Sequence, residues 1–252
     1  MAGHSKWAGI KHKKAVVDAQ RGKLFSKVIR EITAAARLGG GSLEGNPRLR
    51  LAVQKAREAN LTKDAIEKAM KRGTGDLPGV SYEEMVMEGY GPGGVAILVE
   101  LLTDNKNRTS AEIRSLFARF GGNLAGAGSV SWLLQKKGVI TLSAKGVSEE
   151  RLMELALEAG AEDLKVEGEQ ATVMSAPQAL EAVKQALQQA SMTWEAAEVS
   201  MVPTSTVQVD ETVQAKTLLS LLDALEDHDD TQHVYANFDI PDAILAEHAT
   251  AS

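Results

Sequence analysis

The strongest constraint on the fold is the order of strand and helix patterns in the second half of the chain. Strands show apolar residues alternating with period 2, whereas amphipathic helices show a period near 3.6. Six consecutive segments follow these periods in the order β-α-β-β-α-β: residues 139–143, 149–158, 163–167, 171–175, 177–190 and 197–202. This order is the split βαβ arrangement of a ferredoxin-like domain.

Similar patterns lie on both sides of this block. Before it come strands at 85–89 and 95–102, a helix at 110–120 whose Thr109 and Glu112 have capping-box spacing, and a strand at 129–134. After it come a strand at 206–209, a helix at 212–225 and a strand at 233–238. Each side supplies half of a second ferredoxin-like domain, so we predict that the first is inserted into the second.

The N-terminal part of the chain has helical patterns only. A helix is predicted from residue 15 to 38, where three glycines end it. Asn46-Pro47 begins a second helix, and Thr62 caps a third that stops at Gly73. The last two resemble a helix-turn-helix in outline, although any small helical bundle has that outline.

The predicted fold class is therefore α+β, with an N-terminal three-helix domain followed by two ferredoxin-like α/β domains, one inserted in the other. We place the basic arm and helical domain at 1–75. The outer ferredoxin-like domain takes 76–135 plus 204–252, and the inserted domain takes 136–203.

Charge is segregated along the chain. Residues 1–75 hold seventeen Lys or Arg against six Asp or Glu, a net of +11, whereas the remainder holds eleven against twenty-eight, a net of −17. A strongly positive end on an acidic protein indicates a polyanionic partner, and nucleic acid is the first candidate.

The basic residues of this end fall into an arm and a helical face. In the arm, lysines can neutralise phosphates, while Trp7 and His12 can stack on bases or lie in a groove. On the helix, four cations recur at i, i+4, i+7 and i+14. The predicted nucleic-acid-binding residues are His4, Lys6, Trp7, Lys11, His12, Lys13, Lys14, Arg21, Lys23, Lys27, Arg30 and Arg37. Phosphate contacts position a protein but carry no sequence code.

Other chemistries have weaker signatures. Gly91-Pro92-Gly93-Gly94 lacks the Gly-Lys-Ser/Thr ending of a P-loop and precedes a strand, so we expect a turn. The segment from Asp104 to Asn107 departs from a calcium loop, because Lys106 occupies a ligand position. His228, Asp229, Asp230 and His233 are the nearest approach to a metal site, without a third well-spaced His.

No catalytic set is legible, so we expect no enzyme activity, no cofactor and no small-molecule substrate. The chain has no cysteine, which excludes disulfides and thiolate sites. No run approaches the ~18 apolar residues that span a bilayer. We therefore expect a cytoplasmic protein with no membrane partner, and the sequence leaves its oligomeric state open.

Several long motifs resemble the YebC/PmpR family. They are MAGHSKWAGIKHKK with Asp18, Arg21, Lys23, Phe25 and Lys27 after it, the run from Glu88 to Gly94, the run from Thr103 to Thr109, and Gly121-Gly122-Asn123-Leu124. The resemblance covers essentially the whole chain. It implies three domains and a bacterial cytoplasmic protein labelled a probable DNA-binding transcriptional regulator.

The same resemblance implies an alternative role. A mitochondrial relative is a translational activator of cytochrome c oxidase, and the family is also linked to ribosome-associated translation at proline-rich stretches. The partner is therefore DNA, or ribosomal RNA and tRNA on the ribosome, bound through the same basic segment.

Overall fold

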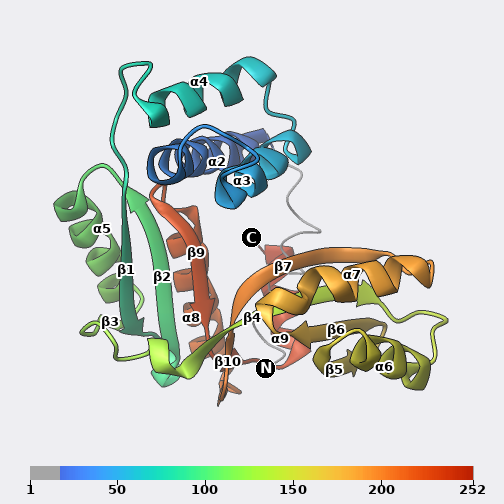
Figure 1. The fold of residues 1–252 in the computed structure, drawn as a ribbon. Helices are drawn as coiled ribbons and strands as arrows, with labels where there is room; N and C mark the ends of the chain where they lie inside the picture. The colour runs from blue at the N-terminus through green and yellow to red at the C-terminus, as the bar shows by residue number, and fades with distance from the viewer. Residues whose placement is uncertain (1–17, 252) are drawn as a thin grey trace. The chain divides into compact units, whose positions relative to one another are not determined.

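The computed structural model describes residues 18–251, in which three N-terminal helices precede two four-stranded antiparallel sheets with helices packed on them (Figure 1). The predicted fold class is confirmed: a three-helix domain is followed by two ferredoxin-like α/β domains, one inserted in the other. The inserted part is a compact unit, Leu133–Thr204. The described residues on either side of it form the other compact unit.

The helical domain consists of α2 (Asp18–Gly39), α3 (Pro47–Glu58) and α4 (Lys63–Thr74). Its core contains Ile32 of α2, Leu49 and Val53 of α3, and Ile66 of α4. Gly73, predicted to end α4, instead lies inside it. A Cβ at this position would be 2.4 Å from the Thr33 carbonyl oxygen, so the missing side chain lets α4 pack closely on α2.

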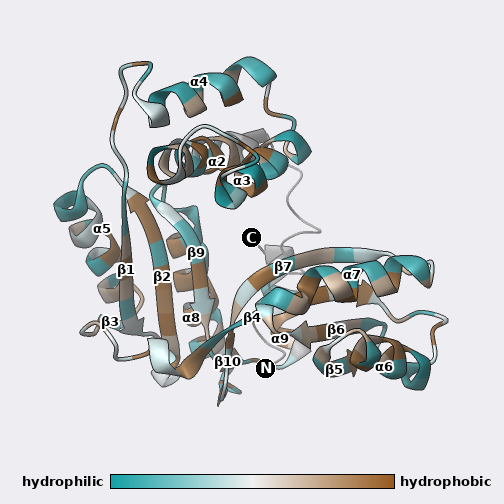
Figure 2. Cartoon of the chain, viewed as in Figure 1, coloured by the Kyte–Doolittle hydropathy of each residue, from teal (hydrophilic) through white to brown (hydrophobic). Residues whose placement is uncertain are grey.

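The outer sheet has the order β3-β1-β2-β9. Its elements are β1 (Glu83–Tyr90), β2 (Ala96–Thr103), α5 (Lys106–Arg119), β3 (Asn123–Leu124), α8 (Thr212–Asp227) and β9 (Thr231–Ala236). Almost every residue of β2 is buried, and its apolar colouring in Figure 2 agrees with a central strand. Phe117 of α5 and Leu218 of α8 pack on the same core.

Short elements complete the outer domain. The turn η1 (Pro92–Gly94) joins β1 to β2, and η2 (Ser131–Leu133) precedes the insertion. Strands β8 (Val207–Gln208) and β10 (Phe238–Asp239) pair with each other in parallel. The helix α9 (Asp242–Ala251) follows, and its Ile244 and Leu245 reach the core.

The inserted domain has the sheet order β5-β6-β4-β7, with every neighbouring pair antiparallel. This is the ferredoxin-like strand order. Its elements are β4 (Leu134–Ser143), α6 (Glu149–Glu158), β5 (Ala161–Glu167), β6 (Gln170–Ser175), η3 (Pro177–Ala179), α7 (Leu180–Gln189) and β7 (Trp194–Pro203). Leu152 of α6 and Val183 of α7 are buried in its core.

The predicted strand at 129–134 is wrong. The buried Glu88 carboxylate accepts hydrogen bonds from the backbone N–H groups of Gly128, Val130 and Ser131, at 2.9, 2.6 and 3.1 Å. These N–H groups are therefore not available for pairing with a neighbouring strand. Burial raises the pKa of Glu88, but these hydrogen bonds more than offset it, so the pKa is lowered and the carboxylate stays ionised. The third strand of the half-domain is instead β3, within a segment read as a loop.

The predicted start of the helix at 110 is also wrong. The Asn105 side chain caps α5 by accepting a hydrogen bond from the Arg108 N–H at 3.1 Å, so the helix begins at Lys106. Thr109, read as the cap, is buried inside α5. In the described part of the chain, no helix is long and apolar enough to cross a bilayer.

Candidate nucleic-acid interface

The predicted arm lies outside the residues that the structure describes. This applies to His4, Lys6, Trp7, Lys11, His12, Lys13 and Lys14, and the side chain of Arg21 is likewise outside the description. The predicted cations whose side chains are described are all on α2: Lys23, Lys27, Arg30 and Arg37.

Two of the α2 lysines contact the C-terminal end of α8. Lys23 Nζ lies 3.1 Å from Asp227 Oδ2, and Lys27 Nζ donates to the Glu226 carbonyl oxygen at 2.5 Å. The last carbonyls of a helix lack intrahelical partners and carry the negative end of its dipole, so cations are favoured there. Since the Lys23 and Asp227 side chains are 45% and 62% exposed, this ion pair contributes at most about 1 kcal/mol.

Arg30 is held more firmly. Its Nη1 donates to Asp230 Oδ1 at 2.6 Å and also to the Asp229 carbonyl oxygen. The guanidinium carbon lies 5.7 Å from the centre of the Tyr82 ring, within cation–π range. The Arg30 and Asp230 side chains are only 19% and 2% exposed, so water screens this pair weakly.

Asp230 is the centre of a hydrogen-bond network that joins three elements. Its Oδ2 accepts from Thr103 Oγ1 at 3.0 Å, Thr109 Oγ1 at 2.6 Å and Arg108 Nη2 at 2.6 Å. Burial raises the pKa of Asp230, but the hydrogen bonds, led by that of Thr109, and the charge of Arg30 lower it further, to below its ordinary value. The motif from Thr103 to Thr109 thus holds a carboxylate from the turn after α8.

We call residues 226–230 the acidic turn. Its oxygen atoms accept hydrogen bonds from Lys23, Lys27 and Arg30, three of the predicted phosphate ligands. The fourth, Arg37, is exposed and forms no ion pair with another described residue. No local spacing could have indicated this arrangement, because 200 residues separate Arg30 from Asp230.

The charge of α4 gives little support to a helix-turn-helix interpretation, in which α4 would be the second helix. Lys63 and Lys68 pair along the helix with Glu67 and Asp64, at 3.7 and 2.8 Å. On α3, by contrast, Arg50, Lys55 and Arg57 are exposed and form no ion pair with any described residue. These three cations are not among the predicted nucleic-acid-binding residues.

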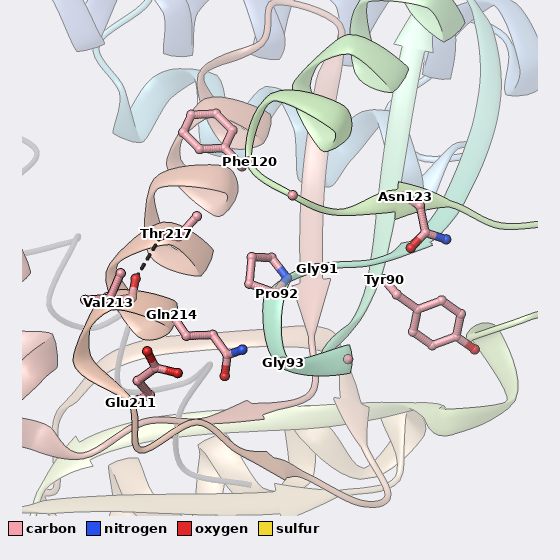
Figure 3. Close-up of a pocket in the computed structure, with 12 residues that line it drawn as sticks. Tyr90, Gly91, Pro92, Gly93, Phe120, Asn123, Glu211, Val213, Gln214 and Thr217 are labelled. Carbon is pink, nitrogen blue, oxygen red and sulfur yellow. Dashed lines mark hydrogen bonds between the residues drawn. The ribbon is translucent and has the colours of Figure 1, made fainter.

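The Gly-rich segment after β1 is a strand-to-strand turn, as expected. The Gly91 N–H donates to the Val95 carbonyl oxygen at 2.8 Å, and Gly93 and Gly94 have φ of 77° and 74°, in the left-handed region. The turn borders an open depression of about 550 Å³, shown in Figure 3. Its described lining includes Glu211 and no Lys or Arg, so its charge does not suit a phosphate.

The histidine region contains no metal cluster among the described residues. Both ring nitrogens of His228 have protein partners, Nε2 at 3.0 Å from Glu112 and Nδ1 accepting the Asp230 N–H at 3.2 Å. His233 instead stacks on Tyr235, with ring centres 5.9 Å apart.

The geometry defines an α+β protein whose basic helical domain precedes two ferredoxin-like domains, and comparison with known proteins assigns its family. Residues 5–76 match the TACO1/YebC protein N-terminal domain, and residues 82–238 match the TACO1/YebC second and third domain. The chain belongs to the TACO1/YebC family.

Relatives are similar over nearly their whole length. A protein of Syntrophobacter fumaroxidans is 54% identical over 97% of this chain and 98% of its own, and one of Geobacter sulfurreducens is 55% identical over 95% and 96%. Both are named probable transcriptional regulatory protein. The crystal structure of a conserved hypothetical protein from Aquifex aeolicus is similar with a TM-score of 0.78 and 49% identity, over 90% of this chain and 94% of that one.

Proposed function

We propose that this protein is a cytoplasmic nucleic-acid-binding regulator of gene expression, acting as a DNA-binding transcriptional regulator. The observation that carries the proposal is the segregation of charge, with +11 in residues 1–75 and −17 in the rest. A basic segment on an acidic protein attracts a polyanion while the acidic part repels it, which orients the encounter. The names of the relatives agree with a regulatory role.

The predicted arm residues are the proposed primary contacts. Each lysine that neutralises a phosphate releases condensed counterions, which is the main source of affinity in such complexes. Trp7 and the arm histidines add stacking or groove contacts. Lys23, Lys27 and Arg30 contribute only where nucleic acid displaces the acidic turn from them, whereas Arg37 is exposed and forms no ion pair with a described residue.

The test measures binding as a function of salt. Fluorescence anisotropy of labelled duplex DNA should give log K falling linearly with log salt. Changing Lys11, Lys13 and Lys14 together to Ala should flatten that slope by about three. A control with the same charge change, Lys136, Lys145 and Lys165 to Ala in the inserted domain, should leave the slope unchanged.

Two results would count against the proposal. If the arm variant keeps the wild-type affinity and slope, the arm makes no phosphate contacts. If the protein instead sediments with ribosomes in a salt-sensitive manner and protects no DNA site, the same basic segment serves RNA and the DNA assignment is wrong.

A further inference from the structure

We infer that the exposed side of α3, carrying Arg50, Lys55 and Arg57, is a second phosphate-binding surface for nucleic acid. We call these three residues the α3 basic face. The inference rests on the proposed function and adds a place on the folded domain to it, outside the arm and outside α2. The observations that carry it are exposure, the lack of acidic partners and a fixed orientation.

The α3 basic face follows from the helical period. At 100° per residue, Leu49, Ala52, Val53 and Ala56 share one side of α3, and all four are buried. Arg50 and Arg57 are two turns apart along one flank of the exposed arc, about 100° round the helix from the buried side and about 10 Å apart along the axis. Lys55 lies on the other flank of the exposed arc.

The cations of the α3 basic face have no acidic partner among the described residues. The nearby carboxylate of the same helix, Glu58, accepts a hydrogen bond from Gln54 at 2.9 Å instead. This differs from α2, where the acidic turn occupies the basic side, and from the first turns of α4, where lysines pair along the helix. Three cations against the one carboxylate of Glu58 leave a net charge of +2 on the exposed side of α3, which favours an external anion.

The N-terminal end of α3 is held rigidly. The buried Asn46 side chain caps α3 by accepting the Leu49 N–H at 3.0 Å, and its amide donates to the carbonyl oxygens of Ala35 and Gly40 at 2.8 and 2.9 Å. A Cβ on Gly39 would lie 2.6 Å from this amide, so a glycine is needed there. A surface fixed in this way loses little conformational entropy on binding.

Arg48 fixes the same end of α3 by charge. It donates to Glu31 of α2 at 2.7 and 3.0 Å, and also to Glu84 of β1. The hydrogen bond with Glu31 raises the pKa of Arg48 above its ordinary value, so this link persists at every physiological pH. Arg48 is therefore a structural cation, distinct from the three free ones.

The composition of the exposed side favours nucleic acid over an acidic protein partner. A protein interface normally has an apolar centre surrounded by a polar rim. Here Leu51, 55% exposed, is the one large apolar side chain on the exposed side of α3. Arginine binds phosphate through a planar fork of donors, which two of the three cations provide.

The experiment compares three proteins in the anisotropy assay, all as full chains. The first is wild type and the second carries Arg50→Gln, Lys55→Gln and Arg57→Gln. The third, the paired-lysine control, carries Lys63→Gln, Lys68→Gln and Lys184→Gln, three lysines that pair with a carboxylate of their own helix. The α3 variant should flatten the salt slope by about three, which is roughly a 100- to 1,000-fold loss of affinity at 0.1 M salt. The control should change the slope by less than one.

A charge-preserving variant, Arg50→Lys with Arg57→Lys, should keep the slope, and unchanged thermal unfolding verifies that each variant is folded. If wild type binds but the α3 variant matches the paired-lysine control, the inference is wrong and the proposed function stands. If wild type shows no salt-dependent binding to DNA or RNA, the proposed function itself fails.

Discussion

The network around Asp230 makes a quantitative prediction for Asp230→Asn, which keeps the side-chain volume and removes the charge. Hydrogen bonds to a charged group contribute about 1.5–3 kcal/mol each, and removing one partner of a buried ion pair costs about 3–5 kcal/mol. Arg108 is 42% exposed and can be rehydrated, so the loss falls at the lower end. We expect the outer domain to lose about 3 kcal/mol of stability.

Native-state hydrogen exchange can measure this loss where it occurs. The Leu102 N–H donates to the Asp230 carbonyl oxygen at 2.8 Å, so its protection reports on the network. A loss of about 3 kcal/mol corresponds to roughly a hundredfold drop in protection, at 1.4 kcal/mol per factor of ten. The control is Asp229→Asn, whose exposed carboxylate makes no contact in the network, and it should change stability by less than about 0.5 kcal/mol.

The pH dependence provides the refuting result. Because the pKa of Asp230 is lower in the folded state than in the unfolded chain, its stabilisation is complete above the unfolded value of about 3.9. It is lost as the pH falls through the folded value. The difference between wild type and Asp230→Asn should therefore be constant from pH 7 to 5 and shrink below about pH 4. A difference that is absent at pH 7, or that grows on acidification, would contradict the network's role.

Two further predictions concern the loop at Glu88. Glu88→Gln places an amide donor against backbone N–H donors and should cost about 2 kcal/mol, measured as faster exchange of the Val130 amide. Gly89→Ala would bring a Cβ within 2.6 Å of the Asn123 carbonyl oxygen and should lower the unfolding temperature, at a cost of about 1–3 kcal/mol. Gly126→Ala has open space around it and should be nearly neutral, so equal effects at the two glycines would refute the steric argument.

The regular elements of the fold could be predicted because their signals are local. The period of the inserted segment gives its six elements in order, and Asn46-Pro47 and Thr62 are the caps that the structure shows. The wrong predictions, the strand at 129–134 and the helix start at 110, lie where a residue distant in sequence forms the hydrogen bonds. Glu88 binds the N–H groups of a segment that alternates like a strand, and Asp230 draws the Thr109 hydroxyl away from a capping position.

The candidate interface was harder to predict for the same reason. Charge counting identifies the basic segment, but it gives no indication of which cations another part of the chain neutralises. The helical spacing of Lys23 and Lys27 would suit contacts with phosphates, but in the structure both lysines contact the end of α8. The exposed cations of α3 were not among the predicted residues, and only the structure shows that they lack acidic partners among the described residues.

Under the proposed function, the contacts of α2 imply an order in which nucleic acid would engage the basic domain. A phosphate at Lys23 replaces an exposed ion pair of at most about 1 kcal/mol, whereas a phosphate at Arg30 must replace a weakly screened bond to Asp230. Release of Arg30 leaves Asp230 Oδ2 with its three donors but removes the Arg30 donor from the buried Oδ1, which adds to the cost. The arm and the α3 basic face should therefore bind first, with Lys23 next and Arg30 last. Only a partner with a high density of negative charge would therefore displace the acidic turn from the α2 cations.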